Sequence, residues 1–151
     1  MAHVNGCDLP EDLYYLIEKH VWVRPAEPGL VTIGVTDVAQ SLAGTIVACT
    51  PKKAGRTVPR GQSLATIESS KWVGPVLSPL SGEIAEVSEV VRKDPGILNR
   101  DPYGAGWLVR LKPSNWEDEK AGLVTGPEGL EAYRAFLERE DIRCGEAAST
   151  G

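Results

Sequence analysis

The residue with the most suggestive chemical setting is Lys71, in the stretch Glu68-Ser69-Ser70-Lys71-Trp72. A β-type run ends at Glu68, two serines carry the chain over a turn, and an apolar run leaves through Trp72, which predicts a hairpin with a lysine near its tip. A protruding amine on a rigid turn suits covalent modification, whereas a Schiff-base lysine must be buried to lower its pKa. Exposed lysines are also common on any protein surface, so the hairpin alone does not decide its role.

The other reactive side chains form no recognisable catalytic or metal-binding pattern. Cys7, Cys49 and Cys144 lack the spacing of metal ligands, and both histidines, His3 and His20, lie near the N-terminus. Cys49 lies in an alternating β run, where a small buried hydrophobe is the ordinary role. No glycine-rich phosphate loop joins a strand to a helix. We therefore expect no metal site and no catalytic constellation.

The composition predicts one globular domain over residues 1–151. With 42% hydrophobic and 25% charged residues, the chain can bury a core. Sixteen glycines and eleven prolines, scattered between short apolar runs, favour a turn-rich β protein. The net charge of −5 argues against nucleic-acid binding. Because no segment has the apolar length of a spanning helix or a signal peptide, we expect no membrane association and a cytoplasmic location.

Turn residues and apolar periodicity divide the chain into short elements. Strands are predicted at 30–35, 45–49, 62–67, 82–88 and 107–111. An apolar stripe in 8–20 predicts a short N-terminal helix, although 14–15 and 20–23 also fit the start of a strand. A single helical turn is predicted over 36–42, a C-terminal helix over about 127–141, and a mobile tail over 143–151.

The stretch around Lys71 resembles the lipoyl-lysine hairpin of glycine cleavage system H proteins, whose pattern is Glu-Ser-Val-Lys-Ala followed by Pro-x-Ser-Gly. Here Glu68-Ser-Ser-Lys71 is followed by Pro79-Leu-Ser-Gly82. Residues 34–40 are similar to the family's Gly-Ile-Thr-x-Tyr-Ala-Gln, and residues 95–107 to its Pro-x-x-Ile-Asn and Asp-Pro-Tyr-x-x-Gly-Trp segments. The resemblance covers roughly residues 14–120.

The resemblance implies a mainly β fold, namely a flattened β sandwich of the hammerhead (barrel-sandwich hybrid) lipoyl type with a short N-terminal helix and a C-terminal helix. Its core would span about 20–114. The resemblance also implies that Lys71 carries lipoate in an amide bond, with Glu68, Ser69, Ser70 and Trp72 as the hairpin context that the lipoate ligase meets. Such a protein is a cofactor-bearing carrier and not an enzyme. Biotin carriers typically have Met-Lys-Met and 2-oxoacid dehydrogenase lipoyl domains Asp-Lys-Ala, and neither pattern fits.

Departures from the family pattern favour one branch of it. His20-Val21-Trp22 stands for His-Glu-Trp, Leu42-Ala43-Gly44 for Leu-Gly-Asp, and an aromatic Trp72 follows the lysine. These features are closer to the lipoate-binding proteins of bacterial sulfur oxidation, which work with a heterodisulfide-reductase-like complex, and we favour that interpretation. The alternative is a glycine cleavage carrier of an aminomethyl group, with glycine decarboxylase, aminomethyltransferase and dihydrolipoamide dehydrogenase as partners. A further alternative is an unmodified structural relative.

Cys7 and Cys144 are both near the ends of the chain, where the last helix would be able to bring them together. One hypothesis is that Cys7 and Cys144 pair, as a disulfide or as a redox site. The alternative is that both cysteines are unpaired. The reducing conditions of the cytoplasm disfavour a structural disulfide.

Overall fold

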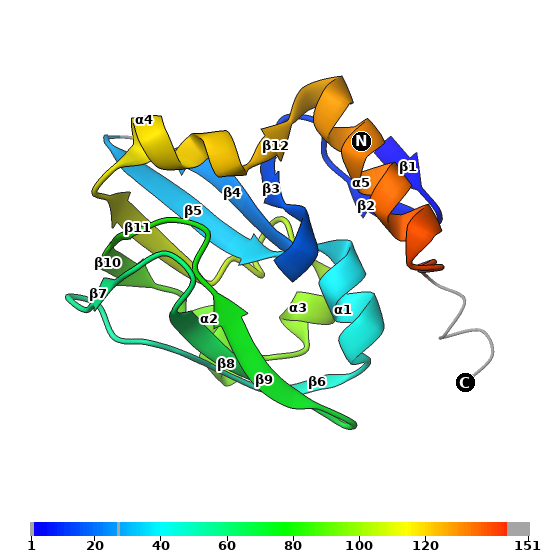
Figure 1. Ribbon diagram of the computed structural model, residues 1–151. Helices are drawn as coiled ribbons and strands as arrows, with labels where there is room; N and C mark the ends of the chain where they lie inside the picture. The colour runs from blue at the N-terminus through cyan, green and yellow to red at the C-terminus, as the bar shows by residue number, and fades with distance from the viewer. Residues whose placement is uncertain (1, 27, 145–151) are drawn as a thin grey trace.

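The computed structural model describes residues 2–26 and 28–144, and its largest element is an antiparallel sheet of seven strands (Figure 1). The strands lie in the order β12-β3-β4-β5-β11-β10-β7. Their bounds are Val124–Thr125 (β12), Tyr14–Leu16 (β3), Val21–Ala26 (β4), Leu30–Val35 (β5), Val109–Pro113 (β11), Gly82–Val87 (β10) and Thr57–Val58 (β7).

A second sheet of three antiparallel strands packs against the first. It consists of β6 (Ile46–Pro51), β8 (Ser63–Ser69) and β9 (Val73–Leu77), with β8 in the middle. Ile33 of the large sheet and Ile67 of the small one belong to the same buried apolar cluster, so the two sheets face each other across a shared core. The fold is the expected mainly β flattened sandwich.

Alternation along β4 creates a second apolar cluster on the other face of the large sheet. Val21 and Val23 belong to the cluster between the sheets, whereas Trp22 belongs to the outer cluster, as the period of two in a strand requires. Trp22 packs over Gly34, where a Cβ would lie 2.5 Å from the indole. Only glycine fits at position 34, which explains why the 34–40 motif begins with glycine.

The C-terminal helix α5 (Gly126–Arg139) and the hairpin of β1 (Ala2–Val4) and β2 (Cys7–Leu9) supply the rest of this outer cluster (Figure 1). The apolar stripe of α5 buries Leu130, Tyr133 and Leu137. The helix predicted at about 127–141 is therefore confirmed to within two residues at each end.

Shorter helices connect the strands. The predicted turn over 36–42 is α1 (Asp37–Ala43), and the Thr36 hydroxyl oxygen caps it by accepting a hydrogen bond from Ala39 N–H at 3.3 Å. The others are the 3-10 turns η1 (Ile17–Lys19) and η2 (Lys120–Gly122), and the helices α2 (Glu89–Lys93), α3 (Ile97–Arg100) and α4 (Trp116–Glu119).

The short N-terminal helix expected within 8–20 is confined to η1. The rest of this segment is extended, because Tyr14–Leu16 pairs antiparallel with Val21–Val23 of β4. Leu9 and Leu13 have the spacing of a helical stripe, but they reach the outer cluster from the end of β2 and from the turn that follows. The alternative, a strand beginning near residue 14, is the correct one.

The predicted mobile tail, 143–151, lies from residue 145 onward outside the described residues. Cys144 is described, and it is buried with its N–H donating to Asn5 O at 3.0 Å. Within residues 2–26 and 28–144, no helix is long and apolar enough to cross a membrane.

Candidate functional site

Lys71 lies at the end of the β8–β9 hairpin, which extends past β6 in Figure 1. Ser69 N–H donates to Trp72 O at 2.7 Å and closes the hairpin, so Ser70 and Lys71 alone form its tip. The Lys71 side chain is exposed. A bulky enzyme is thus able to approach the amine without moving the backbone.

The serines before Lys71 fix the tip in place. The buried Ser69 hydroxyl oxygen accepts from Lys71 N–H at 3.3 Å, and Ser70 N–H donates to Thr45 O at 3.0 Å. The second bond ties the tip to the segment between α1 and β6. The lysine is therefore presented from a turn that the rest of the molecule supports.

Glu68 lies on the outer surface of the three-stranded sheet. It is exposed and pairs in register with Val73 of β9 and Ala48 of β6. The Glu68 side chain therefore faces solvent on the side of the sheet away from the core, where a docking protein has access to it.

Trp72 is held against its own strand by a glycine. A Cβ at Gly74 would overlap the Trp72 ring, so position 74 admits no larger side chain while the indole keeps this place. Trp72 is 47% exposed. Trp72 therefore forms part of the surface beside the lysine.

Lys71 and Trp72 border an apolar cleft of about 630 Å³. The cleft lies between the hairpin, α1 and the segment 18–20. Its lining residues are Glu18, Lys19, His20, Val35, Ala39, Gln40, Leu42, Ala43, Ile46, Ile67, Lys71, Trp72, Pro75, Val76 and Leu77. Its size falls within the range of small-molecule sites, and its walls are predominantly aliphatic.

The aliphatic part of Lys71 lies against the end of α1. A Cβ at Gly44 would lie 3.2 Å from Lys71 Cε, and Gly44 also has a φ of +79°, which L side chains rarely adopt. Glycine at this position ends the helix and leaves room for the lysine.

Asn99 of α3 holds this end of α1 and the start of β6 together. Its side-chain amide donates to Gly44 O at 2.8 Å and to Gln40 Oε1 at 3.0 Å, and its Oδ1 accepts from Ile46 N–H at 2.9 Å. The Asn99 side chain thus bonds two backbone groups and the Gln40 side chain, and it fixes the end of α1 that forms one wall of the cleft.

His20 lines the same cleft, at the end of the segment 18–20. Its Nδ1 lies 2.6 Å from the Tyr133 hydroxyl of α5, and the two rings are stacked with centroids 5.8 Å apart. Burial lowers the pKa of His20 to about 4, so the imidazole is neutral near pH 7.

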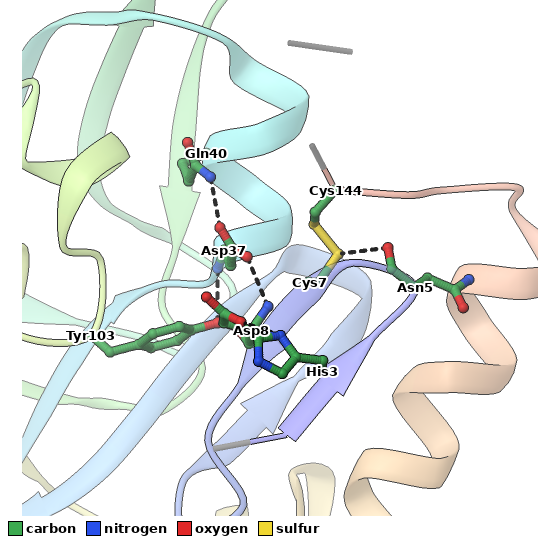
Figure 2. Close-up of polar contacts among 8 residues, drawn as sticks. All are labelled: His3, Asn5, Cys7, Asp8, Asp37, Gln40, Tyr103 and Cys144. Atoms are coloured by element: carbon green, nitrogen blue, oxygen red, sulfur yellow. Dashed lines mark hydrogen bonds and ion pairs between the residues drawn. A yellow bond between two sulfur atoms is a disulfide. The ribbon is translucent and has the colours of Figure 1, made fainter. Parts of the chain in front are cut away.

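Cys7 and Cys144 form a disulfide, with Cα atoms 4.8 Å apart (Figure 2). Their neighbours stabilise the same junction, since Cys144 N–H donates to Asn5 O and a Cβ on Gly6 would lie 2.5 Å from Cys144 O. The structure therefore brings the two cysteines together, but neither lines the cleft. Cys49 is buried, and burial raises its pKa to about 12, which fits a packing role.

Hydrogen bonds connect the β1–β2 hairpin with the first turn of α1 (Figure 2). Asp8 N–H donates to Asp37 Oδ2 at 2.8 Å, and the Tyr103 hydroxyl donates to Asp8 O while accepting from Asp37 N–H. Asp37 Oδ1 accepts from Gln40 Nε2 at 2.6 Å. Gln40 in turn contacts Asn99, so α1 is anchored at both ends.

Sequence reasoning assigned no site role to His20, Gln40 or Asn99. Gln40 and Asn99 lie in the segments 34–40 and 95–107 that carry the family resemblance, which was a usable signal. The partner of His20 lies 113 positions away in α5 and left no local signal. Within the part of the chain that the structure describes, no three His, Cys, Asp or Glu side chains are grouped as metal ligands.

Comparison with known proteins gives consistent matches over most of the chain. The family model described as Glycine cleavage H-protein matches residues 13–139. A protein named glycine cleavage system H protein 5 from Aquifex aeolicus is 46% identical over 149 residues, covering 96% of this chain and all of the relative. A probable glycine cleavage system H protein 2 from Sulfurisphaera tokodaii is 44% identical, covering 95% of this chain and 98% of the relative.

The fold is also similar to a solved structure. The crystal structure of a glycine cleavage system H protein from Mycobacterium marinum superimposes with a TM-score of 0.65 and 36% sequence identity. The match covers 70% of this chain and 87% of the other.

Proposed function

The chain belongs to the glycine cleavage H-protein family, and on this premise we propose that it is a carrier protein in which Lys71 bears lipoate through an amide bond. Members of this family carry lipoate and are not themselves catalysts. The observation that carries the proposal for this chain is the position of Lys71, exposed on a two-residue hairpin tip and bordering an apolar cleft.

The residues around Lys71 fit a lipoyl group. The group has an aliphatic chain and a five-membered disulfide ring, and when bound it supplies a dithiol–disulfide couple that carries other groups on sulfur. Aliphatic side chains of α1, β6 and β8, namely Ala39, Leu42, Ala43, Ile46 and Ile67, line the cleft that starts at Lys71 itself. A free lysine amine is charged near pH 7, and its amide is neutral, so acylation also removes the charge that would oppose burial along this wall.

The chain's own residues present and support the group. Ser69 and Ser70 hold the tip, Glu68 offers a carboxylate to the lipoate ligase on the outer surface, and Trp72 lines the cleft beside the lysine. Asn99 keeps the α1 wall in place from behind. No proton transfer or bond cleavage is required of any of them.

Intact mass measures the modification directly. Protein produced with a lipoate ligase and lipoate should gain the mass of one lipoyl group, and Lys71→Arg should gain none. Lys53→Arg is the matched control, because Lys53 is also an exposed lysine and should leave the increment unchanged. Absence of the increment in the wild type would show an unmodified relative of the family.

The partner system that the family implies is glycine cleavage, with glycine decarboxylase, aminomethyltransferase and dihydrolipoamide dehydrogenase. The relatives with the printed name glycine cleavage system H protein cover this chain almost completely, which favours this set of partners. Lipoylated protein mixed with glycine, glycine decarboxylase and its cofactor should then acquire the mass of an aminomethyl group. Lack of loading, with an authentic H protein loaded in parallel, would count against it.

A second candidate is the transfer of sulfur in an oxidation pathway with a heterodisulfide-reductase-like complex. The loss of two acidic positions favours it, since Val21 and Gly44 stand where the family pattern has Glu and Asp, and a cationic aminomethyl group would find neither carboxylate. Trp72, which is half-exposed, adds an aromatic surface beside the attachment site. Relatives numbered 2, 3 and 5 occur in one organism, Aquifex aeolicus, which leaves room for specialised members. Retention of a sulfane sulfur on the modified protein, without loading by glycine decarboxylase, would support this candidate.

A further inference from the structure

His20 is a cleft residue whose imidazole is fixed from behind. Its Nδ1 lies 2.6 Å from the Tyr133 hydroxyl, and Phe136 packs edge-to-face with the imidazole, with ring centroids 5.7 Å apart. Both aromatic residues come from α5, on the outer side of the large sheet. The ring therefore has one defined position, with α5 on one side and the cleft on the other.

A hydrogen-bond chain determines which nitrogen carries the proton. The Thr36 side chain is fully buried, its oxygen accepts from Ala39 N–H, and its remaining contact is with the Tyr133 oxygen at 3.2 Å. A buried hydroxyl proton needs an acceptor, so Thr36 donates to Tyr133. Because Tyr133 accepts from Thr36, the Tyr133 hydroxyl donates its own proton to its other partner, His20 Nδ1. The neutral imidazole consequently carries its proton on Nε2.

The Nε2–H group faces solvent from the cleft wall. Among the residues that the structure describes, every buried side-chain nitrogen or oxygen has a hydrogen-bond partner. Nε2 makes no protein hydrogen bond and must therefore be accessible. Since His20 lines the cleft and α5 covers its other side, the donor is accessible from the cleft.

The charges near this donor are few. Besides His20, the titratable residues that line the cleft are Glu18, Lys19 and Lys71, and Lys71 becomes neutral on acylation. Glu18 and Lys19 are exposed and opposite in sign, so solvent screens them and their effects oppose each other. On the α5 side, burial raises the pKa of Tyr133 further, so its hydroxyl is neutral. A neutral N–H donor in a predominantly aliphatic wall suits a ligand atom that accepts hydrogen bonds, and it stabilises the anionic form of that atom over the neutral form.

We propose that His20 Nε2–H donates a hydrogen bond to a sulfur atom of the reduced lipoyl group on Lys71 and stabilises the thiolate form of that sulfur. This inference deepens the proposed carrier function and rests on it. His20 then acts as a sulfur-binding residue with Tyr133 as its positioning residue. The ligand class is an anionic sulfur, which the reduced group offers in either partner system.

The tautomer can be tested on the unmodified chain. Long-range ¹H–¹⁵N correlation spectra of the wild type near neutral pH should show His20 with Nε2 protonated and Nδ1 as an acceptor. Tyr133→Phe keeps the stacked ring but removes the hydroxyl, and it should move His20 towards a mixture of tautomers. A wild-type spectrum with the proton on Nδ1 would overturn the proposal, because Nε2 would then have no hydrogen to donate.

The effect on sulfur can be measured on the lipoylated protein after borohydride reduction. The ultraviolet absorbance of thiolates gives their titration midpoints, and the reduced Lys71→Arg chain supplies the blank for the three cysteines. His20→Asn suits the left-handed backbone of position 20, where φ is +57°, and removes the imidazole. We expect the lower lipoyl midpoint to rise by about one pH unit in His20→Asn, a tenfold loss of thiolate at fixed pH. In Tyr133→Phe it should rise by part of that.

Three outcomes separate this inference from the carrier function. A lipoyl mass increment with shifted midpoints supports both. The same increment with midpoints equal in the wild type and both variants refutes the role of His20 and leaves the carrier function standing. Absence of the increment refutes the carrier function, and the inference fails with it.

Discussion

The indole of Trp72 lies so closely over Gly74 that a Cβ at position 74 would overlap the ring. Trp72 directly follows Lys71 and lines the cleft, and Gly74 lies two positions further along the chain, in β9. Gly74 therefore determines where Trp72 lies, and Trp72 determines part of the surface that a bound group or a partner meets.

Replacing Gly74 should displace that indole. We expect Gly74→Ala to change Trp fluorescence and to lower the free energy of unfolding by about 1–3 kcal/mol, the usual cost of forcing a side chain into a filled space. Gly122→Ala is the control, because a Cβ there meets only the end of the Arg60 side chain at 3.7 Å. Similar spectra for both variants would contradict this packing.

Removal of the Asn99 side chain should loosen the α1 wall of the cleft. Asn99→Ala leaves Gly44 O and Ile46 N–H without their partner, and we expect a loss of about 2 kcal/mol in the free energy of unfolding. Urea denaturation measures it. Asn115→Ala removes the same side chain at an exposed position where it makes no side-chain hydrogen bond within the described residues, and it should change stability by less than about 0.5 kcal/mol.

The Cys7–Cys144 disulfide joins the β1–β2 hairpin to the residues after α5 across 137 positions. Its loss should cost about 2–5 kcal/mol, because the unfolded chain regains the freedom of a long loop. Cys7→Ser with Cys144→Ser should unfold at lower urea than the oxidised wild type, and the reduced wild type should match the double variant. Equal stability with and without reductant would contradict a clamping role.

The buried imidazole predicts a pH dependence of stability. His20 has a pKa of about 4 in the folded protein, against 6.5 when unperturbed, so the unfolded chain binds the proton first as the pH falls. Stability should decrease below pH 6.5, and the contribution of His20 to that loss should be complete near pH 4, at about 3 kcal/mol. Urea unfolding over this range should show a smaller decrease for His20→Asn. Parallel curves for the two proteins would argue against a buried neutral imidazole.

Local signals predicted much of the sandwich. The β-branched run Leu30–Val35 and the cap Thr36 gave β5 and α1 almost to the residue, because each depends on its own sequence. The segment 8–20 was assigned too much helix because Leu9 and Leu13 are spaced as in a helix, yet pairing with β4 decides the backbone there. Strands as short as Thr57–Val58 have too few residues for periodicity to show.

The part of the site formed by neighbouring residues in the sequence was predictable, and the part formed by contacts between distant residues was not. The hairpin residues Glu68 to Trp72 lie in one run, so their arrangement followed from the turn chemistry. The tertiary contact of His20 with Tyr133 and that of Asn99 with Gly44 join residues 113 and 55 positions apart, and no local rule gives such pairs. The cysteine pairing remained undecided for the same reason until the fold placed both residues in the outer cluster.

Pro75 removes a hydrogen-bond donor from the free edge of the hairpin that bears Lys71. β9 is an outermost strand of its sheet, and the Ser69–Trp72 bond together with the register places Pro75 opposite Thr66 in a pair that exchanges no ladder hydrogen bonds. The nitrogen of Pro75 therefore faces the free edge and has no hydrogen to offer there. Another chain cannot extend the sheet across this edge with a complete ladder of hydrogen bonds. Contacts at the hairpin therefore depend on side chains, and the free edge of β9 is protected from strand-to-strand self-association.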